Sequence, residues 1–329
     1  MKAIWYDRQG SAAEVLQLGE MPTPQAGSGE LRVRLHASGV NPSDCNRRAG
    51  RNFPPEYPRV IPNSDGAGVV DQVGEGADRR WLGRHVWLYN GQRNGRAFGT
   101  AAEYIALAAD LVTELPDHID FAAGATLGIP AMTAHRSVFL AGPVQGRTVL
   151  VTGGAGAVGH YAIQLAHWAG ARVIATASTP AKAAHARAAG AEHVIDYKTE
   201  DVAERLLELT DGLGVDHVVE VDFGANLAAN LKLVRNLGSI ATYASVGERT
   251  PAVPIYELMR KNISVLTVLL PTSPIESRRR AQADIASWLR AAPRLLTVSQ
   301  RFPLAETARA HEAVERGDKL GTVVVETLA

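Results

Sequence analysis

The stretch TVLVTGGAGAVGHYAIQLAHWAGARVIAT, residues 148–176, decides the fold. It begins with the β-branched apolar run Thr148–Val151, and apolar residues then recur at helical spacing over Val158–Ala169 before a second strand pattern at Val173–Thr176. Between the first strand and the helix lies a G-x-G-x-x-G turn. In this setting the turn is typical of a dinucleotide site, because glycines let backbone N–H groups approach a pyrophosphate at a helix N-terminus. We therefore expect the pyrophosphate of a cofactor to be bound by Gly154, Ala155, Gly156, Ala157, Val158 and Gly159.

The same alternation of strands and helices continues along the chain. Upstream, the Ala-rich segment Phe121–Leu140 predicts a helix broken at Pro130. Downstream, the spacing of apolar residues predicts helices at 181–189, 200–210, 226–236 and 276–291 and strands at 193–196, 216–221 and 239–244. Such alternation predicts an α/β fold with a doubly wound, parallel Rossmann sheet.

The first 120 or so residues follow a different pattern. Runs with a period of two, such as Leu31–Leu35 and Gly66–Val70, predict strands. The final apolar run, Thr322–Glu326, predicts a strand that returns to this region, because a lone terminal strand needs a sheet to join. We therefore expect a mostly β domain formed by residues 1–122 and 295–329, and a dinucleotide-binding domain formed by residues 123–294.

Composition limits the classes of function. A length of 329 residues fits about two domains, and 34 basic residues balance 34 acidic ones. Zero net charge argues against a dedicated nucleic-acid binder and against a polybasic membrane anchor. The single cysteine, Cys45, allows no intramolecular disulfide and no multi-cysteine zinc site. Charges at Asp7 and Arg8 interrupt any signal-peptide core, and no window of about 18 apolar residues occurs, so we expect a soluble cytoplasmic protein with no membrane partner.

The residues after the second Rossmann strand indicate which dinucleotide is used. Proteins that bind NAD usually carry Asp or Glu there to hold the ribose 2′-hydroxyl. This chain has Thr176–Pro180, without an acid, followed by Lys182. Ser178 can hydrogen-bond a 2′-phosphate and Lys182 can supply a positive charge, so we expect NADPH in preference to NADH.

Several stretches across nearly the whole chain carry, together, a resemblance to a known family. They are Gly39–Asp44, Ile61–Gly68, Ala102–Tyr104, Leu127–Pro130 with Thr133-Ala134, the glycine turn, and Gln164–Ala166. In these stretches the sequence resembles the zeta-crystallin-like NADPH:quinone oxidoreductases, which are zinc-free members of the medium-chain dehydrogenase/reductase superfamily. The resemblance implies a Rossmann domain joined to a GroES-like catalytic domain.

The resemblance also bears on metal binding. The zinc alcohol dehydrogenases of this superfamily have Cys where this chain has Asn41, and Gly-His-Glu where it has Asn63-Ser64-Asp65. Asn and Ser are poor zinc ligands, and catalytic zinc needs about three protein ligands. We therefore expect no metal, and we expect Cys45 to be a small buried filler.

Further cofactor contacts are implied by the resemblance alone. Asn41 matches a position that contacts the nicotinamide side of the cofactor, and Thr133 matches another cofactor contact. Lys182 and Tyr197 match residues at the 2′-phosphate. The remaining matches are Ser245, in the turn after a late strand, and Leu269 and Leu270, on the stretch that lines the nicotinamide pocket.

The chain departs from the family pattern where many relatives have tyrosine or another aromatic residue. Asn46 occupies the first of these positions and Arg51-Asn52-Phe53 the second region. Asn41, Asn46 and Phe53 are therefore candidates for the substrate pocket, and the catalytic residues stay unassigned. Tyr89 could replace the lost phenol, although a packed aromatic is the more common role for such a residue.

Without a Lewis acid, the hydride chemistry of NADPH suits an electron-poor, conjugated acceptor. The leading hypothesis is therefore a zinc-independent, NADPH-dependent quinone oxidoreductase that transfers hydride or electrons. An alternative is a reductase of α,β-unsaturated carbonyls, and another is an NADPH-binding protein with an RNA-binding or structural role.

Two sequence features bear on possible partners. The basic run Arg278-Arg279-Arg280 is thin support for RNA binding in a neutral chain, because Glu276 and Asp284 balance it. The apolar strand expected over Ile263–Leu270, next to the final Rossmann strand, predicts a homodimer or a dimer of dimers.

Overall fold

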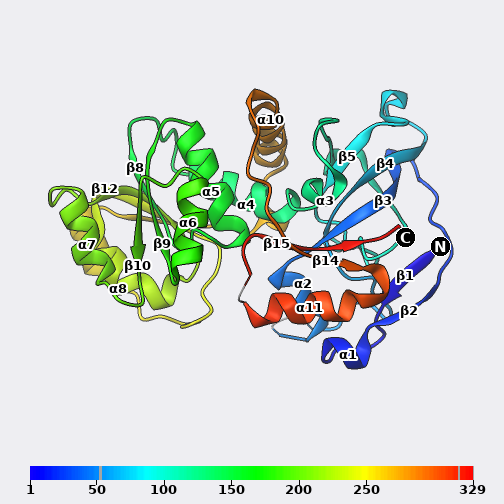
Figure 1. Ribbon diagram of the computed structural model, residues 1–329, viewed down its shortest axis with the longest axis horizontal. Coiled ribbons are helices and arrows are strands. Elements are labelled where there is room, and N and C mark those ends of the chain that lie inside the picture. The colour runs from blue at the N-terminus through cyan, green and yellow to red at the C-terminus, as the bar shows by residue number, and fades with distance from the viewer. Residues whose placement is uncertain (52–53, 318, 329) are drawn as a thin grey trace. The chain divides into compact units, whose positions relative to one another are not determined.

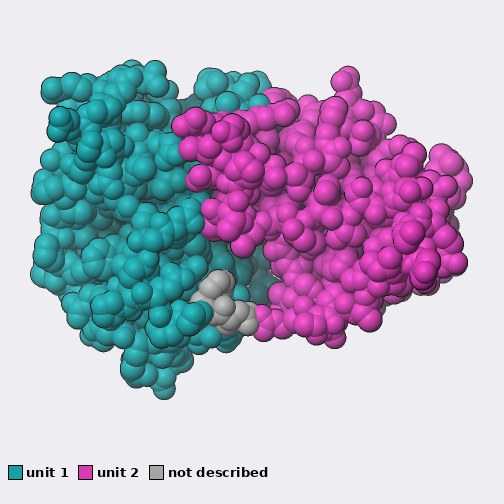
Figure 2. All heavy atoms as spheres, turned by 180° about the vertical axis from the view of Figure 1, so that it is seen from behind, with its two compact units in different colours: residues 1–130, 282–329 teal, residues 131–281 magenta. Residues whose placement is uncertain are grey.

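The computed structural model describes residues 1–51, 54–317 and 319–328. The chain packs into two compact units, residues 1–130 with 282–329 and residues 131–281, shown in two colours in Figure 2. The domain boundaries expected from the sequence, at 122/123 and 294/295, stay a prediction. Across the described residues, no helix combines the length and apolar composition needed to cross a bilayer.

The unit of residues 131–281 contains a six-stranded parallel sheet with the order β10-β9-β8-β11-β12-β13 (Figure 1). Its strands are β8 (Thr148–Val151), β9 (Arg172–Ala177), β10 (His193–Asp196), β11 (Val215–Glu220), β12 (Val234–Thr242) and β13 (Ser264–Thr267). The connecting helices are α5 (Ala157–Trp168), α6 (Pro180–Ala188), α7 (Val202–Leu209), α8 (Phe223–Leu233) and α9 (Ile255–Lys261). The predicted α/β Rossmann alternation is confirmed.

Apolar side chains from strands and helices make the core of this unit. Four adjacent strands, β9, β8, β11 and β12, each contribute one completely buried residue: Ile174, Leu150, Val218 and Ile240. Strand β8 lies between β9 and β11, so the chain reverses its direction of winding there. In open α/β sheets ligands bind at the carboxyl ends of the strands at such a switch point.

The other unit is built on a seven-stranded sheet in which β14-β15-β3-β4-β5-β7 are neighbours and β6 also pairs with β3. These strands are β3 (Glu30–Val40), β4 (Asp65–Val73), β5 (His85–Leu88), β6 (Tyr104–Ala108), β7 (Val112–Glu114), β14 (Val298–Pro303) and β15 (Thr322–Glu326). A separate hairpin pairs β1 (Lys2–Trp5) with β2 (Gln17–Glu20). The terminal strand β15 pairs with β3 and β14, which confirms that it returns to this region.

The remaining helices and the 3-10 turns complete the described fold. They are α1 (Ala12–Val15), α2 (Pro42–Arg48), η1 (Arg79–Trp81), η2 (Ala109–Leu111), α3 (Phe121–Gly124), α4 (Gly128–Phe139), η3 (Leu270–Thr272), α10 (Ile275–Ala291), η4 (Leu304–Glu306) and α11 (Thr307–Arg316).

Two sequence predictions need correction. The helix expected over 121–140 is interrupted at 125–127, and Pro130 lies inside the first turn of α4, where the missing N–H of proline is tolerated. The strand expected over Ile263–Leu270 covers only Ser264–Thr267. Pro271 lies in the 3-10 turn that follows, because it offers no N–H to a strand ladder.

Candidate functional site

The glycine turn lies between β8 and α5, and its three motif glycines are needed for two different reasons. A Cβ on Gly154 would lie 2.9 Å from Ala175 Cβ, and a Cβ on Gly159 would lie 2.3 Å from the carbonyl oxygen of Gly153. These two glycines therefore allow close packing within the fold. A Cβ on Gly156 would meet only the Gly153 oxygen, at 3.3 Å, among the described atoms within 4 Å. The space beside Gly156 is open to a ligand.

Backbone hydrogen bonds fix the turn against the neighbouring strand. The N–H of Gly153 donates to Thr176 Oγ1 at 3.0 Å, and the N–H of Gly154 donates to the carbonyl of Thr176 at 2.9 Å. Gly156 is the N-cap of α5. The first-turn N–H groups of a helix lack intrahelical acceptors and carry partial positive charge, so this turn can bind an anion.

A cavity of about 270 Å³ lies at the carboxyl ends of the central strands. Its lining residues come from β8 to β11 and from the helices that follow: Leu150, Thr152, Gly153, Thr176, Tyr197, Val202, Val221, Asp222, Ala225, Asn226, Ala229 and Asn230. The cavity therefore adjoins the glycine turn at the switch point of the sheet.

The carboxylate of Glu220, at the end of β11, is fully buried beside this cavity and accepts four hydrogen bonds. Its Oε1 accepts from Thr152 Oγ1 at 3.0 Å, the N–H of Asp222 at 2.6 Å and Asn226 Nδ2 at 2.8 Å, and its Oε2 accepts from Asn230 Nδ2 at 2.8 Å. These bonds hold four polar lining residues in place, three by their side chains and Asp222 by its backbone, which gives the cavity a rigid polar wall.

The residues expected at a 2′-phosphate follow the ends of two neighbouring strands. β9 and β10 pair in parallel up to Ala177 and Asp196, so Ser178 and Tyr197 leave the sheet side by side. Lys182 lies in the first turn of α6, where its N–H is capped by Thr179 Oγ1 at 3.2 Å. The ammonium of Lys182 makes no ion pair with any described residue, so its charge is available to an incoming anion. The structure thus brings Ser178, Lys182 and Tyr197 to one edge of the sheet.

The remaining residues expected at the cofactor in this unit differ in exposure. Ser245 Oγ accepts from the N–H of Gly224 at 3.0 Å and donates to the carbonyl of Glu248, so it shapes the loop after β12. Leu269 is 63% exposed whereas Leu270 is 4% exposed, which places one of the two leucines at the surface and the other in the interior. Thr133, in α4, is buried.

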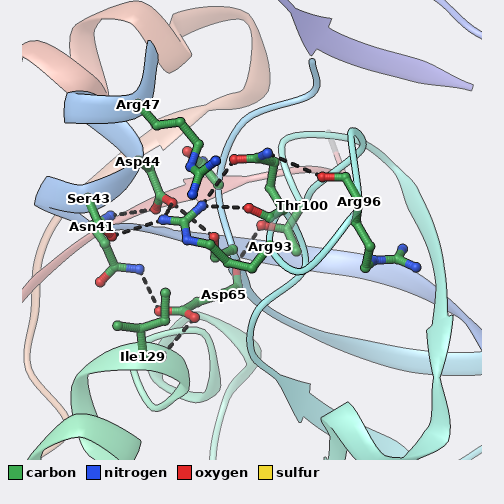
Figure 3. A network of polar contacts seen from close by, with 12 residues as sticks. Asn41, Ser43, Asp44, Arg47, Asp65, Arg93, Arg96, Thr100 and Ile129 are labelled. Carbon is green, nitrogen blue, oxygen red and sulfur yellow. Dashed lines mark hydrogen bonds and ion pairs between the residues drawn. The ribbon is translucent and has the colours of Figure 1, made fainter. Parts of the chain in front are cut away.

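In the unit of residues 1–130 and 282–329, a buried polar network surrounds Asn41, the residue before α2. Figure 3 shows its amide nitrogen pointing at Asp65, and Asn41 Nδ2 donates to Asp65 Oδ2 at 2.6 Å. The other oxygen, Asp65 Oδ1, accepts from the N–H of Ile129 at 2.8 Å, in the first turn of α4. This contact also explains Gly128, since a Cβ there would lie 2.1 Å from Asp65 Oδ1.

The carboxyl of Asp65 is fully buried, and its pKa is raised to about 8. Burial is the largest cause, because it disfavours the charged form, and the neighbouring carboxylate of Asp44 raises the pKa further. The hydrogen bonds from Asn41 and Ile129 and the charge of Arg93 oppose this effect. The orientation of the Asn41 amide therefore depends on a carboxyl group that changes its charge near neutral pH.

A second buried carboxylate, Asp44, lies in α2 and is compensated by an arginine. Arg93 Nη2 donates to Asp44 Oδ1 at 2.8 Å and to Ser43 Oγ at 3.0 Å, and the guanidinium is almost completely buried (Figure 3). Asp44 Oδ1 also accepts from Ser64 Oγ at 3.0 Å, and Asp44 Oδ2 accepts from the N–H of Asn41 at 3.0 Å.

These contacts show whether the site could hold the catalytic zinc of the zinc alcohol dehydrogenases. At the positions where zinc relatives have Cys and His, Asn41 and Ser64 both donate hydrogen bonds to carboxylates. An amide nitrogen and a hydroxyl used in this way are not zinc ligands. Across residues 1–51, 54–317 and 319–328, no group of three or more His, Cys, Asp or Glu side chains is placed to hold a metal ion. The residues present do not fit catalytic zinc.

The substrate-pocket candidates of this unit are only partly placed. Asn46 is half-buried in α2, whereas Phe53 lies outside the described residues. Tyr89 is 1% exposed with its ring 6.4 Å from that of Trp87, which fits a packed aromatic. Cys45 is buried, as expected for a small filler, and burial raises the pKa of its thiol.

Sequence reasoning missed the polar residues that organise Asn41. Asp44 and Asp65 stood in the family-like stretches, but nothing local indicated that they are buried. Arg93 gave no signal, since a single arginine in a Gly-rich loop is usually a solvated side chain.

Comparisons with known proteins agree with this geometry. Residues 27–117 match the family model for the alcohol dehydrogenase GroES-like domain, and residues 157–287 match that for zinc-binding dehydrogenases. The human quinone oxidoreductase is 30% identical over 92% of this chain and 91% of its own length, and that of Pseudomonas aeruginosa is 30% identical over 95% of each.

Solved structures give the same result. A mycobacterial protein complexed with NADPH has a TM-score of 0.86 at 30% identity over 99% of both chains. The Escherichia coli quinone oxidoreductase, also complexed with NADPH, has a TM-score of 0.86 at 27% identity over 99% of this chain and 100% of its own. A 2-haloacrylate reductase has a TM-score of 0.81 at 26% identity over 100% of both.

Proposed function

This chain belongs to the quinone oxidoreductases of the medium-chain dehydrogenase/reductase superfamily, and from that premise we propose that it is a zinc-independent, NADPH-dependent reductase of quinones. The observation that carries the proposal is the hydrogen bonding of Asn41 and Ser64. Both side chains are committed to buried carboxylates at the positions where zinc relatives carry metal ligands. An acceptor that is already electron-poor and conjugated needs no Lewis acid to receive a hydride equivalent.

The residues present fit NADPH. The open space beside Gly156 and the N-terminus of α5 would hold the pyrophosphate, and the cavity lined by Thr152, Asp222 and Asn226 would take the adenosine portion. Lys182, with Ser178 and Tyr197 beside it, would neutralise a 2′-phosphate. When bound, NADPH supplies the hydride equivalent.

The chain also contributes by orienting the nicotinamide ring through the side chain of Asn41. Because Asn41 Nδ2 donates to Asp65, the amide oxygen of Asn41 faces away from the carboxyl group and can accept a hydrogen bond from the carboxamide of the nicotinamide ring. Asp65 is thus a positioning residue, since it fixes which end of the Asn41 amide is presented.

A screen of cofactors against acceptors tests the proposal. Purified protein is assayed with NADPH or NADH and with 1,4-benzoquinone, 9,10-phenanthrenequinone or 2-alkenals, under anaerobic conditions with radical detection. We expect NADPH-dependent quinone reduction well above the rate in buffer. A quinone rate equal to that of buffer, or equal use of NADH, would contradict the proposal.

A second candidate is reduction of the C=C bond of α,β-unsaturated carbonyls. It is favoured by the similarity to the 2-haloacrylate reductase, because a 2-haloacrylate is an α,β-unsaturated acid. In the same screen it predicts turnover of 2-alkenals or 2-haloacrylates without quinone turnover.

We also propose a homodimer formed through β13. This strand pairs with β12 on one side only and is the edge of its sheet, and the adjacent helix α9 exposes Ile255, Tyr256 and Met259. An uncovered strand edge beside an apolar helix face can pair with a second copy across a two-fold axis. Light scattering tests this, because a stable monomer of 35.1 kDa would contradict it.

A further inference from the structure

The side chain of Asn90, two residues after β5, is buried without a hydrogen-bond partner. It is 0% exposed, and among the described residues nothing accepts from its Nδ2 or donates to its Oδ1. No other described side chain leaves two buried polar atoms unpartnered. Buried polar groups are nearly always hydrogen-bonded, because loss of water is costly when nothing replaces it. The amide therefore calls for a partner that is not part of the described chain.

The position of Asn90 in the sheet places it at the polar network around Asn41. The antiparallel register of β4 and β5, continued by two residues, sets Asn90 opposite Ser64, and the N–H of Gly91 donates to the carbonyl of Ser64 at 2.8 Å. Strand β3, on the other side of β4, ends at the same level, with Asn41 immediately after it. Asn41, Ser64 and Asn90 thus gather at one end of three neighbouring strands.

The backbone at Asn90 restricts which residues can occupy this position. Its φ is +57°, in the left-handed region that non-glycine residues rarely adopt. Asn tolerates this conformation better than most residues do, so the site combines a constrained backbone with an uncompensated amide. Such combinations cluster at ligand sites.

We propose that Asn90 binds the carbonyl oxygen of the acceptor, with its Nδ2–H as donor. The proposal rests on the proposed quinone reductase activity and names the group that holds the acceptor. Reduction of a quinone takes one hydride from NADPH, which leaves as NADP⁺, and one proton from water. The hydroquinone that results carries O–H groups, and Oδ1 of Asn90 can accept from one of them. A neutral amide therefore matches both the oxidised and the reduced form, without titrating.

The variants are chosen so that the backbone conformation is kept. Asn90→Gly removes the amide and adopts a positive φ without strain, and Asn90→Asp keeps the shape but loses the donor. Asn94→Gly is the matched control, because Asn94 lies in the same loop with a φ of +54° and an exposed side chain. Binding of 1,4-naphthoquinone to protein loaded with NADP⁺, which cannot donate hydride, is followed by tryptophan fluorescence and compared with kcat and KM under NADPH.

We expect both Asn90 variants to weaken naphthoquinone binding and raise KM by roughly tenfold, the loss typical of one buried hydrogen bond, with NADP⁺ affinity unchanged. Asn94→Gly should match the wild type. Equal naphthoquinone affinity in Asn90→Gly and wild type, or no binding to the wild type, would overturn the inference and leave an enclosed water as the amide's partner. Asn90-dependent binding without NADPH oxidation would support the inference while refuting the proposed function. Quinone turnover that is the same in the Asn90 variants and the wild type would support the proposed function while refuting the inference about Asn90.

Discussion

The substitution Asp65→Asn tests the electrostatics of the buried network most directly. Asp65 accepts from Asn41 Nδ2 and from the N–H of Ile129 while being fully buried, and its pKa is about 8. Asn has the same shape but cannot ionise, so the substitution removes the cost of burying a charge. It also replaces one accepting oxygen with an NH₂ group, which forces the Asn41 amide to turn and present its nitrogen instead of its oxygen.

The sign and size of the pH effect follow from linkage. Between the ordinary Asp pKa of 3.8 and the folded value of about 8, the folded state holds a proton on Asp65 that the unfolded state has released. The free energy of unfolding therefore falls as pH rises through this window, by about 1.4 kcal/mol per pH unit. The contribution is fully present below the unfolded pKa and is lost as pH rises through the folded pKa.

A buried histidine opposes this slope at lower pH. Burial lowers the pKa of His311 to about 4, so below its ordinary value of 6.5 the unfolded state binds a proton that the folded state does not. That contribution makes the free energy of unfolding rise with pH up to about 6.5. Burial also lowers the pKa values of His36, His185 and His217, and the contribution of all these histidines fades above about pH 6.5. Because the variant keeps them, the difference between the two proteins reports Asp65, and from about pH 6.5 to about pH 8 the wild type should lose roughly 2 kcal/mol that Asp65→Asn retains.

Urea unfolding followed by circular dichroism, at a series of pH values, measures this difference. Subtraction of the variant from the wild type cancels His311, which both proteins contain. Asp71→Asn is the control, because Asp71 lies on the same strand with a partly exposed side chain paired to Arg32. Parallel curves for wild type and Asp65→Asn above pH 6.5 would refute the reasoning, since they would mean that Asp65 has the same charge in both states.

Four further substitutions test the cofactor site and the proposed interface. Lys182→Ala should weaken NADPH binding by roughly 1–3 kcal/mol and leave NADH binding unchanged in fluorescence titrations, and an equal loss for both would contradict a role at the 2′-phosphate. Gly156→Ala should weaken cofactor binding with an almost unchanged melting temperature, whereas Gly159→Ala should lower the melting temperature because its Cβ would meet the Gly153 oxygen at 2.3 Å. The opposite order would refute the division of roles in the turn. Thr267→Pro should convert a dimer to a monomer in light scattering. The N–H of Val268 donates to Thr242 of β12, so the N–H of Thr267 faces the open edge of the sheet, and proline removes it. An unchanged mass would exclude pairing at that position.

The Rossmann sheet was predictable because its signals are local. Strand β8, the glycine turn and α5 follow one another within about twenty residues, and each carries its own apolar period or glycine pattern. Position in the chain likewise predicted that Thr322–Glu326 returns to the first sheet. Pro130 misled the prediction because a proline at the start of a helix and one that breaks it look alike until the first turn is located.

The network around Asn41 could not be predicted, because its contacts join residues far apart in sequence. Asp65 meets a side chain 24 positions before it and a backbone N–H 64 positions after it, and Arg93 reaches Asp44 across 49 positions. No periodic pattern encodes such pairs. The sequence also could not predict that the amide of Asn90 is buried without a hydrogen-bond partner among the described residues, because an asparagine after a strand ordinarily marks a solvated turn.

The two buried carboxylates of this network are compensated by different means, and the difference has a functional consequence. Asp44 is paired with Arg93 and accepts from Ser64 and Asn41, so its charge is balanced within the fold. The two oxygens of Asp65 accept only from neutral donors. The negative charge of Asp65 is therefore removed by binding a proton, whereas that of Asp44 is balanced by the guanidinium of Arg93. Where zinc relatives place a cation beside these positions, this chain has Asn41, whose amide serves as a donor toward Asp65 and leaves its oxygen free. The same two residues, Asn41 and Ser64, thus account for the lack of zinc ligands and support the proposed preference for an acceptor that needs no Lewis acid.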